Sequence, residues 1–163
     1  MSERSRRRVA YSDFRRDMTG SVIYAAIADF GIPNTKFVKV GHTHELVNRL
    51  AGLQTGCPVQ IGDVAYARCP NIDVARQTEG LIHKAMRLYQ SQGEWFRFDL
   101  SDPEHERVWR GAIPAVLNFT VGNGKWTLRS INYAEIRDAA ETARREKVAK
   151  FFKRRKRALT GTG

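Results

Sequence analysis

The chain has 163 residues, of which 42% are hydrophobic, and a formal net charge of +11. This length supports one domain of ordinary size with a buried core. The sequence shows no apolar run of membrane-spanning length and no signal peptide, so we expect no membrane partner. Cys57 and Cys69 are too few for a disulfide framework and lack zinc-ligand spacing with the four histidines, which predicts reduced thiols in a cytoplasmic protein.

The positive charge is concentrated at the two ends of the chain. Residues 1–16 hold six arginines against Glu3 and Asp13, and residues 144–157 hold nine lysines and arginines against Glu146, whereas the middle is close to neutral. Such ends are typical of nucleic-acid-binding proteins, because each neutralised phosphate releases counterions and adds affinity. Solubilising tails and attraction to anionic lipid are the alternatives, and we favour nucleic acid.

The first half of the chain predicts a β-hairpin. Residues 1–20 are expected to form a mobile arm with a short helix near residues 11–18. Residues 22–28 are an apolar run of strand length, and residues 29–35 contain the glycine and proline of a turn. A second strand at residues 36–42, with alternating apolar positions, therefore returns as an antiparallel partner.

An amphipathic helix is predicted directly after this strand. Thr43 suits its N-cap, and Glu45 suits its first turn, where exposed N–H groups favour a negative charge. Arg49 lies at the rim of the apolar arc, where its stem can pack while the guanidinium faces a cleft. A third strand is predicted at residues 59–68.

The clearest helix is predicted at residues 72–90, where apolar side chains cover a broad arc. Glu79 lies just outside this arc, and His83 lies one turn further along the same rim. A carboxylate beside apolar neighbours costs desolvation energy unless a cation meets it. A metal ion or Arg49 can supply that cation.

Trp95 and Phe96 are expected to close the core. A helix follows at residues 102–119, with Asp102 as its cap, and Pro114 is expected to break or kink it.

The last helix is predicted at residues 133–159. It has apolar side chains at core-like spacing, up to Phe151 and Phe152. Its first half is expected to dock on the domain, and its second half is too charged to bury. The side chains predicted to hold a nucleic-acid backbone are Lys147, Lys150, Lys153, Arg154, Arg155, Lys156 and Arg157.

Several short motifs follow one another in a recognisable order. They are V-I-Y in the first strand, K-V-G in the second, an arginine eight residues after that glycine, L-Q-T-G-C-P at the end of the helix, and then E-x-x-x-H and G-E-W-F. Together they resemble the GIY-YIG nuclease superfamily over residues 21–99. They look most like its phage-associated subgroup, in which a lysine replaces the second-motif tyrosine.

The resemblance implies an α/β (α+β) domain with a small three-stranded antiparallel sheet flanked by helices. We therefore expect a basic arm at residues 1–20, a nuclease domain at 21–100, and a helical extension at 101–163 that ends in a basic DNA-binding helix. A phage or mobile-element nuclease of the homing type, in a bacterial or phage-infected cell, is also implied by the resemblance.

The resemblance also implies roles for particular residues. The matching positions are Tyr24 for the first-motif tyrosine, Lys39 for the second-motif tyrosine, Gly41 for its glycine, Arg49 for the catalytic arginine and Glu79 for the metal ligand. A guanidinium offers a permanent, planar charge to a phosphoryl oxygen. A carboxylate is a hard ligand that suits Mg²⁺ or Mn²⁺, and Mg²⁺ keeps several waters when few carboxylates hold it.

The general base is left open by the sequence. Tyr24 would have to lose a proton whose unperturbed pKa is about 10, with help from a neighbouring Lys39 ammonium, or Lys39 would itself act when deprotonated. His42 and His44 are the other candidates. We place His42 ahead because it lies where the strand runs out toward the cleft.

Secondary candidates have ordinary structural alternatives. His83 and Glu94 could assist the site. The alternative for His83 is a hydrogen-bonded pair with Glu79 on the helix face, and the alternative for Glu94 is a solvated residue at the edge of a turn. Trp109 and Trp126 could stack on bases, but we expect both to pack.

The sequence hypothesis is a metal-dependent endonuclease that hydrolyses DNA. A catalytically silent DNA-binding module on the same fold, and a nuclease acting on RNA, are the alternatives. A homodimer is left open.

Overall fold

A central six-stranded sheet organises the protein in the computed structural model, which describes residues 19–160 and the side chains of residues 20–155. The strands are β1 (Thr19–Ala28), β2 (Thr35–Glu45), β3 (Ile61–Arg68), β4 (Gln90–Gln92), β5 (Trp95–Asp99) and β6 (Arg129–Asn132). Their order is β4-β5-β2-β1-β3-β6, and every neighbouring pair is antiparallel. The predicted α+β class is confirmed, but the prediction of only three strands is wrong.

Three strands were missed: β5, which lies between β4 and β2, and the two edge strands β4 and β6. β4 and β6 have three and four residues, none of them buried, so they lack the apolar alternation that predicts a strand. Each forms only because the neighbouring strand offers a row of unpaired backbone groups.

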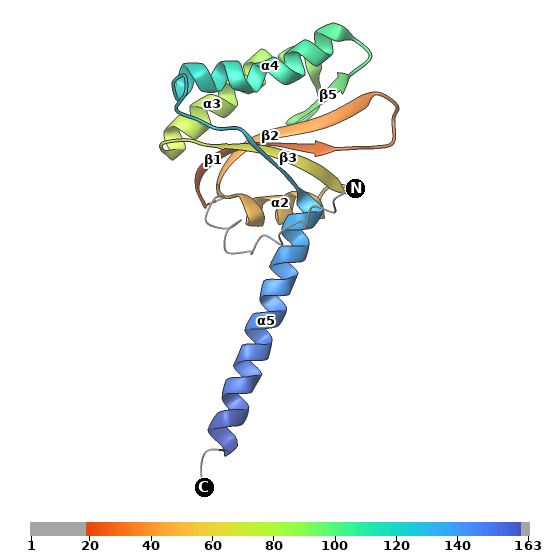
Figure 1. Cartoon of the computed structure of the whole chain (residues 1–163). Coiled ribbons are helices and arrows are strands. Elements are labelled where there is room, and N and C mark those ends of the chain that lie inside the picture. The colour runs from red at the N-terminus through yellow and green to blue at the C-terminus, as the bar shows by residue number, and fades with distance from the viewer. Residues whose placement is uncertain (1–18, 161–163) are drawn as a thin grey trace, which may run out of the picture.

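Helices cover both faces of the sheet. The described residues form the α-helices α2 (Leu46–Thr55), α3 (Ile72–Ala85), α4 (Pro103–Thr120) and α5 (Tyr133–Thr160), and the 3₁₀ turn η1 (Arg87–Tyr89). α3 and α4 lie on one face, α2 lies on the other, and α5 projects away from the domain as a long rod (Figure 1). None of these helices is long and apolar enough to cross a membrane.

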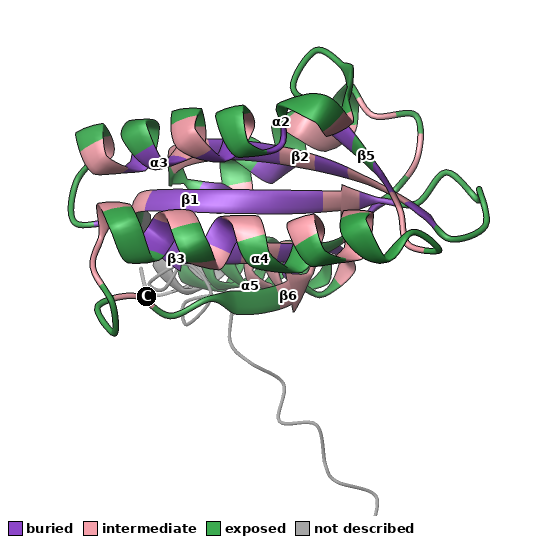
Figure 2. Cartoon of the chain, turned by 90° about the horizontal axis from the view of Figure 1, so that it is seen from above, coloured by how far each residue is buried: buried purple, intermediate pink, exposed green. Residues whose placement is uncertain are grey.

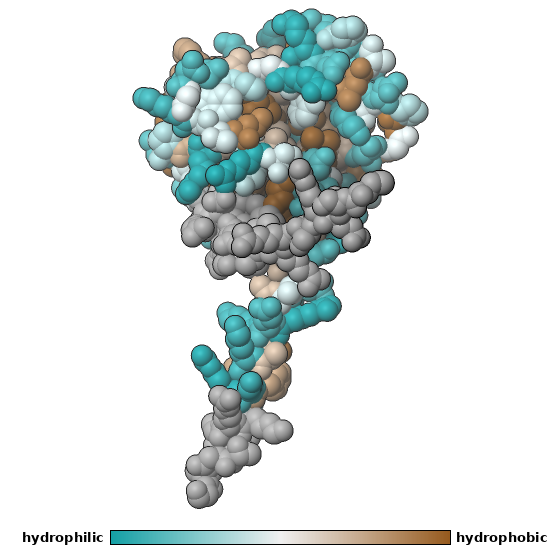
Figure 3. All heavy atoms as spheres, in the orientation of Figure 1, coloured by the Kyte–Doolittle hydropathy of each residue, from teal (hydrophilic) through white to brown (hydrophobic). Residues whose placement is uncertain are grey.

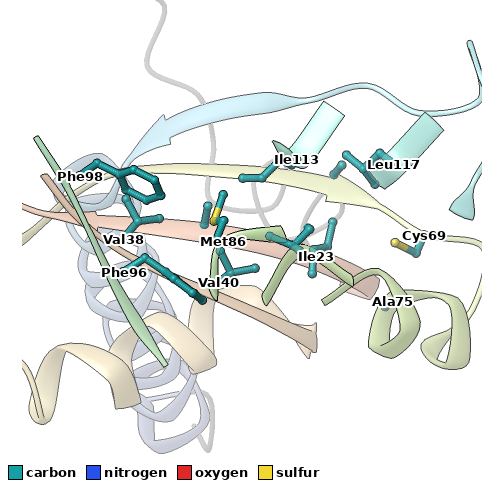
Figure 4. Packing of buried hydrophobic residues seen from close by; sticks show 13 residues of the cluster. Ile23, Val38, Val40, Cys69, Ala75, Met86, Phe96, Phe98, Ile113 and Leu117 are labelled. Atoms are coloured by element: carbon teal, nitrogen blue, oxygen red, sulfur yellow. The ribbon is translucent and has the colours of Figure 1, made fainter. Parts of the chain in front are cut away.

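Two apolar clusters hold the layers together. One joins the sheet to α3 and α4 and includes Val38, Val40, Phe96 and Phe98 (Figure 4). The other lies beneath the opposite face and includes Tyr24 and the α2 residues Leu46 and Leu50. β1 runs between them and is buried along most of its length (Figure 2). In β2, Val38 and Val40 are both fully buried in the first cluster, which confirms that they share an apolar face.

The predicted hairpin is also confirmed. β1 and β2 pair from Thr19 opposite Glu45 to Ala28 opposite Phe37. In the turn, Asp29 accepts a hydrogen bond from the Gly31 amide at 2.9 Å and pairs with Lys36 at 2.6 Å.

The prediction that Thr43 caps the next helix is wrong. β2 runs on to Glu45, and α2 begins at Leu46 with Glu45 as an N-cap that makes no side-chain capping bond. Thr43 pairs with Val22 in the ladder and accepts a hydrogen bond from the Glu45 amide at 3.1 Å. Thr43 is β-branched and therefore fits a strand position. Its pairing with β1 outweighs the local capping signal.

The predicted helix at residues 72–90 is too long. α3 ends at Ala85, and Gln90 already pairs with Phe96 of β5. Leu88, expected on the apolar arc, is 85% exposed.

In the C-terminal part, the prediction of Asp102 as the cap of α4 is confirmed, since it accepts a hydrogen bond from the Glu104 amide at 2.9 Å. Pro114 does not break α4, which continues to Thr120. α5 docks through Tyr133 and Ile136, but Phe151 and Phe152 are exposed rather than core residues.

Some predictions fall outside the described residues. They are the short helix at residues 11–18, nearly all of the basic arm at residues 1–20, and the side chains of Lys156 and Arg157. Both cysteines are free thiols, and burial raises the pKa of the Cys69 thiol.

Candidate active site

Tyr24 and Gly41 face each other in the β1–β2 ladder. The Tyr24 side chain is only 1% exposed, and it lies so close to residue 41 that a Cβ there would be 2.5 Å from its hydroxyl oxygen. Only glycine leaves room for this ring position, because real Cβ atoms do not approach to such distances.

α2 brings Arg49 to the same tyrosine. Leu46 and Leu50 are fully buried against the sheet and fix the helix on either side of Arg49. The Arg49 Nε donates a hydrogen bond to the Tyr24 hydroxyl at 3.0 Å. The terminal Nη groups have no hydrogen-bond partner among the described residues, so they are available to an anion.

Burial and charge act in opposite directions on Tyr24. Burial raises the pKa of its hydroxyl, and the hydrogen bond and charge of Arg49 lower it, with burial the larger effect. The carboxylates of Glu79 and Glu94 raise the pKa of Tyr24 further. Tyr24 is therefore held in its protonated, hydrogen-bonding form at neutral pH.

Glu79 projects from α3 toward the end of β2. Its Oε2 pairs with the Nδ1 of His42, and the two side chains are 18% and 25% exposed. One turn further along α3, the His83 Nε2 donates a hydrogen bond to the backbone oxygen of Val40 at 3.1 Å, and its ring meets Phe96 edge-on. These contacts tie α3 to β2 on both sides of Gly41.

Lys39 lies on the same face of β2 as Gly41, two residues earlier in the alternation. Its Nζ pairs with the Glu94 carboxylate at 2.8 Å and lies 5.9 Å from the centre of the Trp95 ring. The hydrogen bond and charge of Lys39 lower the pKa of Glu94. The cation that hydrogen-bonds to Tyr24 is thus Arg49, and Lys39 has a carboxylate partner instead.

Seven predicted site residues are linked in this way. Three pairs connect Arg49 to Tyr24, Glu79 to His42, and Lys39 to Glu94, and His83 braces α3. The pairs also act on one another, because Glu79 and Glu94 influence the pKa values of both Tyr24 and Arg49. The linked residues are Tyr24, Lys39, His42, Arg49, Glu79, His83 and Glu94.

The predicted nucleic-acid-binding residues lie elsewhere. The described members, Lys147, Lys150, Lys153, Arg154 and Arg155, are exposed on the projecting part of α5 (Figure 1). The structure does not bring them to the seven linked residues.

The donor groups fit one kind of metal ion. No cluster of three or more His, Cys, Asp or Glu residues able to hold a metal is found within residues 19–160. The zinc sites of proteins require such a cluster. Mg²⁺ is held by one or two carboxylates with waters and substrate phosphates completing its shell, and Glu79 can serve as that carboxylate because only one of its oxygens pairs with His42.

One cavity with cationic side chains in its lining was missed from the sequence. It lies where β3, β6 and the segment after α4 meet, and its lining includes Arg68, Lys125, Trp126 and Arg129. The one local signal was the aromatic residue within the basic run K-W-T-L-R.

One comparison with known proteins identifies a family. Residues 21–113, more than half of the chain, match the family model described as the T5orf172 domain, a phage-derived domain related to GIY-YIG nucleases. No curated protein matches the chain, and no solved structure does. The relation to GIY-YIG nucleases is thus confirmed, while the lysine-bearing subgroup stays a prediction. The chain belongs to the T5orf172 domain family.

Proposed function

We propose that the protein is a metal-dependent endonuclease that hydrolyses DNA phosphodiester bonds. The observation that carries the proposal is the Arg49–Tyr24 hydrogen bond, which leaves the Nη groups of Arg49 available, while the charge of Glu79 acts on Arg49 and raises its pKa. The family relation to GIY-YIG nucleases supports the same chemistry.

Arg49 is the proposed phosphate ligand. Hydrolysis adds negative charge to the phosphoryl oxygens in the transition state, and preorganised cations stabilise that charge. The bond from Nε to Tyr24 fixes the guanidinium plane, so its Nη groups can donate to two oxygens at once. Lys39 is proposed as a second cation for the same phosphate, released from Glu94 when substrate arrives.

Glu79 is the proposed ligand of Mg²⁺ or Mn²⁺. A bound ion of this kind supplies positive charge and coordinated waters for the departing oxygen. His42 orients the Glu79 carboxylate through the contact with Oε2. His83 holds α3 against β2 and is proposed as a positioning residue.

The first prediction concerns cleavage itself. Wild-type protein is expected to nick supercoiled plasmid with Mg²⁺ and to leave it intact with a chelator. Glu79→Gln and Arg49→Ala are each expected to reduce the rate by about 100- to 1,000-fold, because the first weakens the hold on the metal ion and the second removes a cation that stabilises the transition state. The measurement is gel-resolved nicking over time.

Arg107→Ala is the matched control for the arginine change. Arg107 lies on the outer surface of α4 and pairs with Glu104, so its loss should leave nicking unchanged. Nicking by Glu79→Gln at the wild-type rate would contradict the catalytic assignment. A chelator-insensitive complex without cut product would favour the silent DNA-binding module, and faster cutting of an RNA of the same sequence would favour the RNA nuclease.

The second prediction tests Tyr24 and His42, two of the candidate bases. Tyr24→Phe removes the hydroxyl that accepts from Arg49, and His42→Gln removes the imidazole that meets Glu79. In the variant that lacks the base, the cleavage rate should no longer rise with pH. In the other variant, the rate should be lower but should still rise with pH. Single-turnover nicking between about pH 5 and 10 measures this, and two unchanged profiles would exclude both residues as the base.

A further inference from the structure

A second polar site lies on the sheet beyond the proposed active site. It is a cavity of about 290 Å³ between β3, β6 and the segment that joins α4 to β6. The side chains that give it its character are Tyr66, Arg68, Lys125, Trp126 and Arg129.

The cavity has the chemistry of an anion site with an aromatic wall. Three of its lining residues, Arg68, Lys125 and Arg129, are cationic. Tyr66 is 5% exposed, and Trp126 is partly buried. Cations that converge beside a rigid aromatic ring are suited to a ligand with both a phosphate and a flat ring.

The wall of the cavity is fixed before any ligand binds. The Trp126 Nε1 donates a hydrogen bond to the Asn118 side chain of α4 at 2.9 Å, and the indole packs against the apolar cluster beneath α4. The preceding turn is closed by a bond from the Lys125 amide to the Gly122 oxygen at 3.1 Å. Gly122 has φ of +107°, which a residue with a side chain rarely adopts.

The sheet register connects this cavity to the proposed active site. One cross-strand row runs from Gly41 in β2 to Tyr24 in β1, Tyr66 in β3 and Arg129 in β6. Directly opposed residues share a face of an antiparallel sheet, and neighbouring strands lie about 4.8 Å apart. Arg129 therefore lies on the face of Tyr24, roughly 10 Å away along the row, which is a distance of one or two nucleotides.

We propose that this cavity binds one unpaired nucleotide of the nucleic-acid substrate. Its phosphate lies among Arg68, Lys125 and Arg129, and its base stacks on Trp126. The volume is near the lower limit of small-molecule pockets, which suits a single nucleotide. Naming the ligand as nucleic acid rests on the proposed nuclease function, and the site makes single-stranded or flapped DNA the preferred substrate class.

The test is equilibrium binding in chelator, where no cleavage takes place. The probes are a fluorescein-labelled oligothymidylate of about 12 nucleotides and a blunt duplex of the same length. Trp126→Ala is expected to weaken binding of the single strand by about 5- to 100-fold, because the stacking of one base is removed, and to change duplex binding by less than about twofold. Lys125→Gln is expected to lower the salt slope for the single strand by about 0.7.

Two variants control for folding and for bulk charge. Trp126→Phe keeps an aromatic wall and should retain most of the single-strand affinity, even if Trp126→Ala perturbs the fold. Arg107→Gln removes a positive charge from exposed α4 and should not change the preference for the single strand. Quenching of intrinsic fluorescence by thymidine 5′-monophosphate, but not by thymidine or inorganic phosphate alone, is expected if phosphate and base bind together.

Wild-type affinity of Trp126→Ala for the single strand would overturn the proposal, and so would equal losses on single strand and duplex. The outcome is independent of catalysis. If binding depends on Trp126 but the wild type does not cleave, the nuclease function is contradicted and the nucleotide site is supported. If nicking depends on Mg²⁺ but Trp126→Ala has no effect on binding, the nucleotide site is contradicted and the nuclease function is supported.

Discussion

At the scale of single residues, the close approach of Tyr24 to Gly41 decides the geometry of the proposed site. The Tyr24 ring occupies the space that a side chain at residue 41 would need, and its hydroxyl then reaches the Nε of Arg49. The ring cannot move aside freely, because it is 1% exposed and packed within the cluster that joins β1 to α2. The Tyr24 ring can therefore take this position only if residue 41 is glycine.

The third prediction tests this requirement. Gly41→Ala would place a Cβ 2.5 Å from the Tyr24 hydroxyl, and overpacking of this kind costs about 1–3 kcal/mol of unfolding free energy. The displaced ring should also lose its bond to Arg49, so nicking should fall together with stability. Urea denaturation and the plasmid assay measure the two effects.

Gly52→Ala is the matched control. Gly52 lies in α2, only three residues after Arg49, and a Cβ there would meet nothing within 4 Å. Alanine in a helix interior should therefore raise the unfolding free energy by about 0.5–1 kcal/mol. Equal stability of Gly41→Ala and wild type would show that the ring is free to move.

At the scale of elements, the proposed site is assembled from neighbours on both sides of β2. α2 supplies Arg49 from one face of the sheet, and α3 supplies Glu79 and His83 from the other. Each helix is fixed by buried apolar residues, so its charged side chains are already held in place before substrate binds. This arrangement suits catalysis, because groups on packed helices hold their positions better than groups on free loops.

The fourth prediction concerns the two halves of α5. Ile136 is fully buried against the sheet, so Ile136→Ala should cost about 2–5 kcal/mol of unfolding free energy. Phe151 and Phe152 are 59% and 61% exposed. The double change Phe151→Ala/Phe152→Ala should therefore shift stability by no more than about 0.5 kcal/mol, as measured by urea denaturation.

Urea denaturation of the same double variant at several protein concentrations completes this test. A loss of stability that depends on protein concentration would mean that the two phenylalanines are buried between copies of the chain, which is the homodimer left open by the sequence. A concentration-independent loss would contradict the exposed position of this stretch.

At the scale of the whole molecule, charge and shape divide the chain into two regions. The folded body is close to neutral, and α5 carries a dense run of cations away from it (Figure 1). The described surface of α5 beyond the body is largely hydrophilic (Figure 3). A rod of this kind adds sequence-independent contacts with phosphates at a distance from the site of cleavage. It raises affinity and the rate of encounter without changing the chemistry at Arg49.

The fifth prediction tests that division. Lys147, Lys150, Lys153 and Arg154 are exposed, so changing all four to Gln should leave the unfolding free energy unchanged. The salt slope of duplex binding should fall by about 0.9 for each phosphate that the variant no longer neutralises. Titration of a labelled duplex at several salt concentrations measures this, with Arg107→Gln/Arg110→Gln on α4 as the control for charge removed elsewhere.

If the slope stays at the wild-type value, α5 does not hold DNA. A slope that falls equally in the control pair would mean that total charge, and not the position of α5, controls binding.

The sequence by itself determined the features that depend on neighbours along the chain. Alternation in residues 36–42 predicted the strand β2, and Asp102 before Pro103 predicted the start of α4. The motifs spaced along residues 21–99 predicted the relation to GIY-YIG nucleases. These signals are local, because side-chain period and capping depend on residues a few positions apart.

Only the tertiary structure decided which charged groups meet. Arg49 bonds to a tyrosine 25 residues away, and His42 meets a glutamate 37 residues away, so neither contact follows from local pattern. The same holds for Lys39, which finds Glu94 and not Tyr24. The edge strands β4 and β6 form because β5 and β3 offer them backbone partners, and the cavity around Trp126 exists only because β6 closes beside β3. Strand pairing joins distant segments, and that pairing, rather than any local preference, sets the positions of these side chains.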